Sequence, residues 1–155
     1  MTPCMRLLKK TKIEYKLVQY SHDDACESYG EEAARKLGVA QEKVFKTLVV
    51  VTENKEFAIG IVPVSKKLSL KAMAKALGAK KIAMADARDV EKITGYVLGG
   101  VSPLGQKKKL KTMIDESAKE FDSIFVSAGK RGLEVELSPK DLQESMQAKF
   151  ENIAI

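Results

Sequence analysis

Apolar residues recur at helical spacing in five segments of the chain, and each segment follows a side chain that can cap a helix. The expected helices cover residues 3–12, 29–37, 70–77, 87–93 and 139–148, with Thr2, Ser28, Ser69, Asp86 and Ser138 as their caps. Ser28 is followed three residues later by Glu31, which is the spacing of a capping box. Glycines at 38, 78 and 95 stand where a left-handed residue commonly ends a helix.

Segments rich in β-branched residues predict the strands. The clearest pair covers residues 44–52 and 57–62, which flank the turn Glu53-Asn54-Lys55 and predict an antiparallel hairpin. Shorter strands are expected at residues 16–20, 112–114, 124–127 and 133–137, with an edge strand at 150–155. Strands and helices interleave without a strict strand-helix-strand rhythm, so the pattern predicts an α/β or α+β fold with a mixed sheet.

The length of 155 residues suits one domain spanning residues 1–155. An apolar share of 45% and a charged share of 31% are typical of a globular protein and argue against a fibre or a disordered chain. The longest apolar run, residues 48–51, is far shorter than the roughly 20 residues of a membrane span. No secretory signal pattern opens the chain, so we expect a cytoplasmic protein that does not bind membranes.

The formal net charge of +6 favours a polyanionic partner without identifying one. Lys107, Lys108, Lys109 and Lys111 form one basic cluster, and Lys130-Arg131 forms a smaller basic turn. The lysine cluster can meet phosphates and give salt-sensitive binding, although most lysine runs are only solvated surface.

Lys46 lies within the predicted strand 44–52, in which both alternating faces are apolar. Val44 and Leu48 share its face, while Phe45 and Val49 occupy the other. A buried ammonium needs an acidic partner, a water-filled pocket or an anionic ligand, because otherwise it costs several kcal/mol or loses its proton. The alternative interpretation is that Lys46 lies near the strand end and its ammonium reaches solvent.

The glycine-rich stretch GYVLGGVSPLG covers residues 95–105. The adjacent Gly99 and Gly100 would let a ligand approach backbone N–H groups that can bind a carbonyl oxygen or a phosphate. A tight turn without a ligand explains these glycines equally well, and the spacing matches no established nucleotide-binding motif.

The usual catalytic nucleophiles are poorly supported. His22 and Cys26 lie four residues apart in a polar, turn-like region, and no third group orients them as a catalytic pair. The two cysteines, Cys4 and Cys26, lack the spacing of a zinc site or a disulfide framework. A GxSxG serine motif is also absent from the sequence. We therefore expect no metal and no cofactor.

Seven segments, taken together in their order and spacing, resemble the bacterial YbaK proteins over essentially the whole chain. The YbaK proteins are cysteinyl-tRNA(Pro) deacylases related to the editing domain of bacterial prolyl-tRNA synthetases. The segments are Met1-Thr2-Pro3, Tyr20-Ser21-His22-Asp23, Gly30-Glu31-Glu32, Phe45-Lys46-Thr47-Leu48, KALGAKK from Lys75, GYVLGGVSPLGQKKK from Gly95 and GKRGL from Gly129. The sequence departs from the family pattern at Tyr29, where phenylalanine is more usual, and at Ala128.

The resemblance implies a mixed, largely antiparallel, barrel-like sheet flanked by helices. It implies trans-editing, the removal of wrongly attached cysteine from tRNA(Pro), with tRNA(Cys) as a further substrate and prolyl-tRNA synthetase as a partner. Lys46 matches the residue most tied to activity, and we expect Lys107, Lys108 and Lys109 to hold the tRNA. The positions matching the aminoacyl pocket are Tyr20, Tyr29, Thr47, Gly99, Gly100 and Glu134.

The family mechanism accounts for the missing protein nucleophile, since the thiol of the substrate is thought to attack its own carbonyl. The protein then only orients the substrate and stabilises developing charge. Two alternatives stay open. One is a binding module for tRNA or a synthetase that catalyses nothing, and the other is a deacylase for another small amino acid such as alanine.

Overall fold

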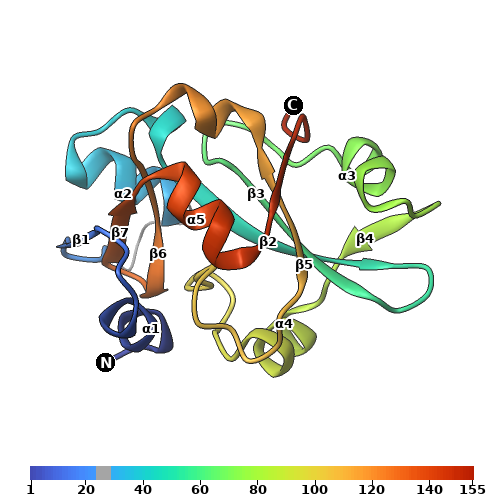
Figure 1. The fold of residues 1–155 in the computed structure, drawn as a ribbon, viewed down its shortest axis with the longest axis horizontal. Helices are drawn as coiled ribbons and strands as arrows, with labels where there is room; N and C mark the ends of the chain where they lie inside the picture. Colours follow the sequence, from blue (N-terminus) through green and yellow to red (C-terminus); the bar gives the residue numbers. More distant parts are fainter. Residues whose placement is uncertain (24–28) are drawn as a thin grey trace.

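The computed structural model describes residues 1–23 and 29–155 and shows helices packed around two β-sheets (Figure 1). The α-helices of the described residues are α1 (Pro3–Lys10), α2 (Tyr29–Leu37), α3 (Leu70–Leu77), α4 (Ala87–Thr94) and α5 (Pro139–Met146). Two short 3₁₀ helices are η1 (Gln41–Lys43) and η2 (Glu116–Glu120). The strands are β1 (Lys16–Gln19), β2 (Phe45–Thr52), β3 (Phe57–Pro63), β4 (Ile82–Met84), β5 (Lys111–Asp115), β6 (Ile124–Lys130), β7 (Leu133–Leu137) and β8 (Lys149–Glu151).

The larger sheet has the strand order β4-β2-β3-β5-β8, and the smaller sheet has the order β1-β7-β6. Pairing is antiparallel within the smaller sheet and between β2 and its two neighbours, whereas β5 is parallel to both β3 and β8. These pairings confirm the predicted mixed, largely antiparallel α/β class. Both sheets are open, and the expected barrel-like closure amounts to a parallel bridge between Val44 and Phe125 that joins the start of β2 to β6.

The predicted capping residues begin the helices that they were expected to begin. The side chains of Thr2, Ser69, Asp86 and Ser138 each accept a hydrogen bond from a backbone N–H three residues later. Gly78 and Gly95 are left-handed and end α3 and α4, as predicted. The predicted Ser28 cap lies outside the described residues.

Three short elements were not predicted. Strand β4 has only three residues, two of them exposed, and pairs with the end of β2. The helix η1 has three residues and η2 has five. The final strand is shorter than expected, and a separate bridge between Leu68 and Ala154 continues its path.

The larger sheet is buried on both faces, which fixes the position of β2. Val49 packs with Ile59, Ile61 and Ile114 on the face that also meets α1, α4 and the smaller sheet. Val50 packs on the opposite face with the side chains of α3. Figure 1 shows β2, β3 and β5 crossing the middle of the molecule, with α3 and β4 on one side and β1, β6 and β7 on the other. The start of β2 therefore lies between the two sheets.

No helix in the described parts of the chain combines the length and the hydropathy that crossing a membrane requires.

Candidate active site

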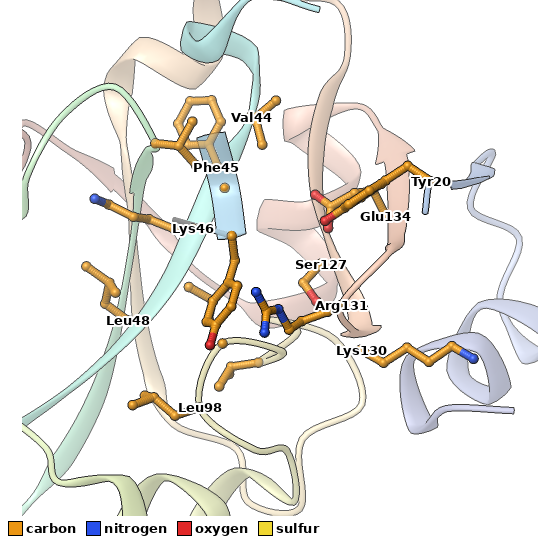
Figure 2. Close-up of a pocket in the computed structure, with 16 residues that line it drawn as sticks. Tyr20, Val44, Phe45, Lys46, Leu48, Leu98, Ser127, Lys130, Arg131 and Glu134 are labelled. Carbon is orange, nitrogen blue, oxygen red and sulfur yellow. The ribbon is translucent and has the colours of Figure 1, made fainter. Parts of the chain in front are cut away.

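A cavity of about 330 Å³ lies where the start of β2 meets α2, the glycine-rich loop and the turn between β6 and β7 (Figure 2). Six of the seven expected pocket and catalytic residues line it: Tyr20, Tyr29, Lys46, Thr47, Gly99 and Glu134. Further lining residues that the sequence reasoning did not place in a pocket include Leu98, Ser127, Lys130 and Arg131. The topology therefore brings together residues spread over more than one hundred positions.

Lys46 is the second residue of β2, opposite Val62 of β3, and its side chain is partly buried. Burial lowers the pKa of its ammonium, the nearby positive charge of Lys67 lowers it further, and the negative charge of Glu31 opposes both. The environment of Lys46 is thus intermediate between the two that the sequence allowed, because its side chain is neither enclosed in the core nor fully solvated. Its ammonium is a partly desolvated cation at the cavity wall.

The glycine-rich loop brings its backbone directly against an aromatic ring. Gly99 has a φ of +92°, and a Cβ atom placed there would lie 2.2 Å from Cε2 of Tyr29. Only glycine fits both the left-handed backbone and this contact. Gly100 does not line the cavity among the described residues, and its N–H donates to the carbonyl of Val97 at 3.0 Å. The Gly100 N–H is thus used within the turn.

Tyr29 stacks against Arg131, which the sequence reasoning noted only as part of a basic turn. The guanidinium carbon of Arg131 lies 3.4 Å from the centroid of the Tyr29 ring, a close cation–π contact. Strand pairing shifts register between Ser127 and Lys130, which marks a bulge just before Arg131. The sequence signal for this arrangement was the GKRGL segment, in which glycines enclose two cations.

Glu134 occupies the central strand of the smaller sheet, opposite Val18 of β1 and Ser127 of β6. Its residue is only 6% exposed, and burial raises the pKa of its carboxyl to about 8. The negative charge of Glu134 adds to burial in raising the pKa of Tyr20, so the two groups are near each other. At neutral pH the Glu134 carboxyl is largely protonated.

Thr47 contributes a further polar group to the cavity wall. Its Oγ1 is buried and has no hydrogen-bond partner among residues 1–23 and 29–155. A buried hydroxyl without a partner is uncommon in native proteins and often marks a place where a ligand or water completes the hydrogen bonding.

His22 supports the chain next to the cavity. Its Nδ1 lies 2.9 Å from Oε1 of Glu32, and the backbone N–H of Asp23 donates to Oε2 of the same carboxylate. Burial opposes ionisation of Glu32, but these hydrogen bonds and the charges of His22 and Lys36 lower its pKa overall. Cys26, the other member of the disfavoured Cys-His pair, lies outside the described residues.

The lysine cluster does not border the cavity in the described part of the chain. The side chain of Lys107 lies over Gly95, and Lys109 donates a hydrogen bond to Gln147 at the end of α5. The expected tRNA-binding lysines Lys107, Lys108 and Lys109 are therefore not lining residues of the pocket, whereas Lys130 and Arg131 are. No group of three His, Cys, Asp or Glu side chains able to hold a metal ion occurs among the described residues.

Comparison with known proteins gives a family match over most of the chain. Residues 23–145 match the model of the aminoacyl-tRNA editing domain. A protein of Enterococcus faecalis, provisionally named a Cys-tRNA(Pro)/Cys-tRNA(Cys) deacylase, is 37% identical over 98% of this chain and 92% of its own length. A proline–tRNA ligase of Brachyspira hyodysenteriae is 28% identical over 59% of this chain and 16% of the ligase.

Solved structures give the same fold. A crystal structure provisionally described as a trans-editing enzyme for prolyl-tRNA synthetase has a TM-score of 0.86. The two chains are 22% identical, and the match covers 100% of this chain and 99% of the other. A hypothetical protein of known structure matches with a TM-score of 0.89 at 23% identity, over 99% of this chain and 100% of its own.

Proposed function

Because this chain belongs to the aminoacyl-tRNA editing domain family, we propose that it is a trans-editing deacylase that removes cysteine from mischarged tRNA(Pro) and from tRNA(Cys). The observation that carries the proposal is the cavity that contains Lys46. Its volume of about 330 Å³ lies at the small end of the range of roughly 300–1,000 Å³ for ligand pockets. It suits an aminoacyl group and its ribose, with the body of the tRNA outside.

In the proposed reaction, the thiol sulfur of the bound cysteine attacks its own carbonyl carbon. The carbon–oxygen bond of the ester breaks, the thiol proton passes to the ribose oxygen, and the amino acid leaves as a four-membered thiolactone that water later opens. Negative charge grows on the carbonyl oxygen as the sulfur attacks. A positioned cation or N–H group stabilises that charge more than it stabilises the ground state.

Lys46 is the residue that we assign to this charge. Its ammonium is partly desolvated, which strengthens its interaction with an oxyanion relative to the same interaction in water. Gly99 is the loop residue at the cavity, and Thr47 offers a buried hydroxyl to the substrate. We assign no contact with the substrate to the Gly100 N–H, because it already donates to the carbonyl of Val97 within the loop.

A deacylation panel tests the proposal. The purified protein is incubated with tRNA(Pro) charged with cysteine, serine or alanine, and with cysteinyl-tRNA(Cys), and the remaining ester is measured over time. We expect both cysteinyl-tRNAs to be deacylated at least 100-fold faster than the serine and alanine forms, because only cysteine carries the attacking thiol. Equal rates would contradict thiol assistance.

The same panel separates the alternatives. Preferred loss of alanine would make the protein a deacylase for another small amino acid. Salt-sensitive binding of tRNA with every ester intact would make it a binding module without catalysis.

We further propose that Lys107, Lys108 and Lys109 hold the tRNA, with prolyl-tRNA synthetase as the partner that releases the substrate. Replacing all three lysines with glutamine is expected to weaken tRNA binding and to reduce the slope of log affinity against log salt by about 2–3, close to one per phosphate contact. Fluorescence anisotropy at several salt concentrations measures the slope. Lys9 and Lys10 at the end of α1, replaced in the same way, provide the control. An unchanged slope in the triple variant would show that these three lysines make no contact with the tRNA phosphates.

A further inference from the structure

The cavity contains one acidic side chain among several basic ones. Of the described residues that line it, Lys46, Lys130 and Arg131 are cationic and only Glu134 is a carboxylic acid. Figure 2 shows Glu134 beside Tyr20, whereas the Lys46 side chain points away from them on the other side of the pocket. The two ends of the cavity therefore differ in charge.

Glu134 also lies deeper than the groups at the entrance. It is 6% exposed, compared with 36% for Tyr29 and 61% for Leu98. In the described part of the chain, the Glu134 carboxyl makes no hydrogen bond and no ion pair, and burial is the one cause of its raised pKa. A largely buried carboxyl that lines a cavity and has no protein partner leaves its oxygens to a ligand or to water in that cavity.

We propose that Glu134, with Tyr20 beside it, binds the free α-ammonium group of the aminoacyl ester and thereby restricts the protein to substrates with an unblocked amino group. This inference rests on the proposed deacylase function. The tRNA must remain at the entrance, so the deep end receives the amino acid rather than the ribose. Of the groups in an amino acid ester, the ammonium is the one that forms a charge-assisted hydrogen bond with a carboxylate.

The protonation of the site is consistent with this assignment. An arriving ammonium favours the ionised form of Glu134, so binding releases the carboxyl proton to solvent. Lys46, Lys130 and Arg131 line the cavity as cations, and Glu32, whose charge reaches Tyr20, is not among the lining residues. The negative charge of Glu134 acts on the hydroxyl of Tyr20 and on the thiol of Cys4, and burial raises the pKa of both. The Tyr20 hydroxyl and the Cys4 thiol therefore stay neutral near neutral pH. Glu134 is then the group of the three that can pair with the ammonium as an anion.

The selectivity follows from the geometry of the deep end. Acetylating the amino group removes its positive charge and adds volume next to the buried Glu134. A site built to pair a polar group discriminates strongly against an analogue that leaves its own buried group unpaired. The protein should therefore spare tRNAs that carry an N-blocked amino acid or a peptide.

The test compares cysteinyl-tRNA(Pro) with N-acetylcysteinyl-tRNA(Pro), which retains the thiol. We expect the wild-type protein to prefer the free amine by at least 100-fold in kcat/KM, and Glu134→Gln to lose most of this preference through a lower rate on the free-amine substrate. Glu136→Gln is the matched control, two residues along the same strand and bonded to Ser123 outside the cavity. Equal wild-type rates on both substrates, or an unchanged preference in Glu134→Gln, would overturn the inference.

A binding measurement keeps this inference separate from the proposed function. Calorimetry with cysteinyl-adenosine joined through an uncleavable amide, and with its N-acetyl form, requires no catalysis. Tighter binding of the free-amine compound by the wild-type protein, lost in Glu134→Gln, supports the ammonium site even if no ester is cleaved. Equal affinities of the two compounds for the wild-type protein would overturn it.

Discussion

Replacing Lys46 with alanine is expected to reduce kcat for cysteinyl-tRNA(Pro) deacylation by about 10²–10³-fold, the usual cost of losing one donor to a developing oxyanion. The ammonium is partly desolvated at the cavity wall, and the described residues provide no second lysine lining that side of the pocket. Because the role proposed for Lys46 is to stabilise charge that develops mainly in the transition state, kcat should fall much more than KM rises. Single-turnover measurements with charged tRNA test this directly.

Two further variants separate chemistry from folding. Lys46→Met keeps an unbranched apolar stem in the strand and should show the same loss of kcat with a circular dichroism spectrum like that of the wild-type protein. Lys71→Ala removes an exposed lysine from α3 and should leave deacylation unchanged. Wild-type turnover by Lys46→Met would show that the ammonium has no part in the reaction.

Glu134→Gln is expected to make the protein more stable than wild type at pH 8.5 and about equally stable at pH 4. The carboxyl has a pKa of about 8 in the folded protein and an ordinary value near 4.5 when unfolded. Between these values the folded state holds a proton that the unfolded state has lost, so wild-type stability falls as the pH rises through this window. At about 1.4 kcal/mol per pH unit, the full loss is on the order of 5 kcal/mol.

Urea unfolding at half-unit steps from pH 4 to pH 9 measures this effect as the difference between the two proteins. Other titrating groups contribute equally to both proteins, so they cancel in the difference. Glu144→Gln, at an exposed position of α5, is the control and should run parallel to wild type. A constant difference between wild type and Glu134→Gln over the whole range would contradict the raised pKa of Glu134.

Local chemistry accounts for the parts of the fold that the sequence predicted. Ser69 and Gly78 delimit α3 through contacts within a few residues, and the β2–β3 hairpin depends on one short turn. Strand β4 was missed because its three residues form a strand only by pairing with the end of β2, which a local pattern does not reveal. The division of the strands into two sheets was not predicted for the same reason, because the strand order depends on tertiary contacts.

The candidate site shows a similar division. A lysine between apolar neighbours pointed to Lys46 from the sequence alone, whereas Glu134 entered only through family resemblance. Arg131 was missed as a pocket residue because a bulge in β6 and its stacking on Tyr29 bring it to the cavity. The contact of Lys109 with Gln147 is also a tertiary contact, which the sequence of the lysine cluster does not predict.

The contact between Gly99 and the Tyr29 ring limits how this pocket can evolve or be redesigned. A methyl group at position 99 would overlap the ring, and one at Gly30 would lie 2.2 Å from Cγ1 of Val64. Both positions are therefore closed to variation, and libraries that randomise them would yield mostly inactive proteins. Variation in the shape of this pocket is therefore left to the lining positions that carry side chains, such as Tyr29, Thr47 and Leu98.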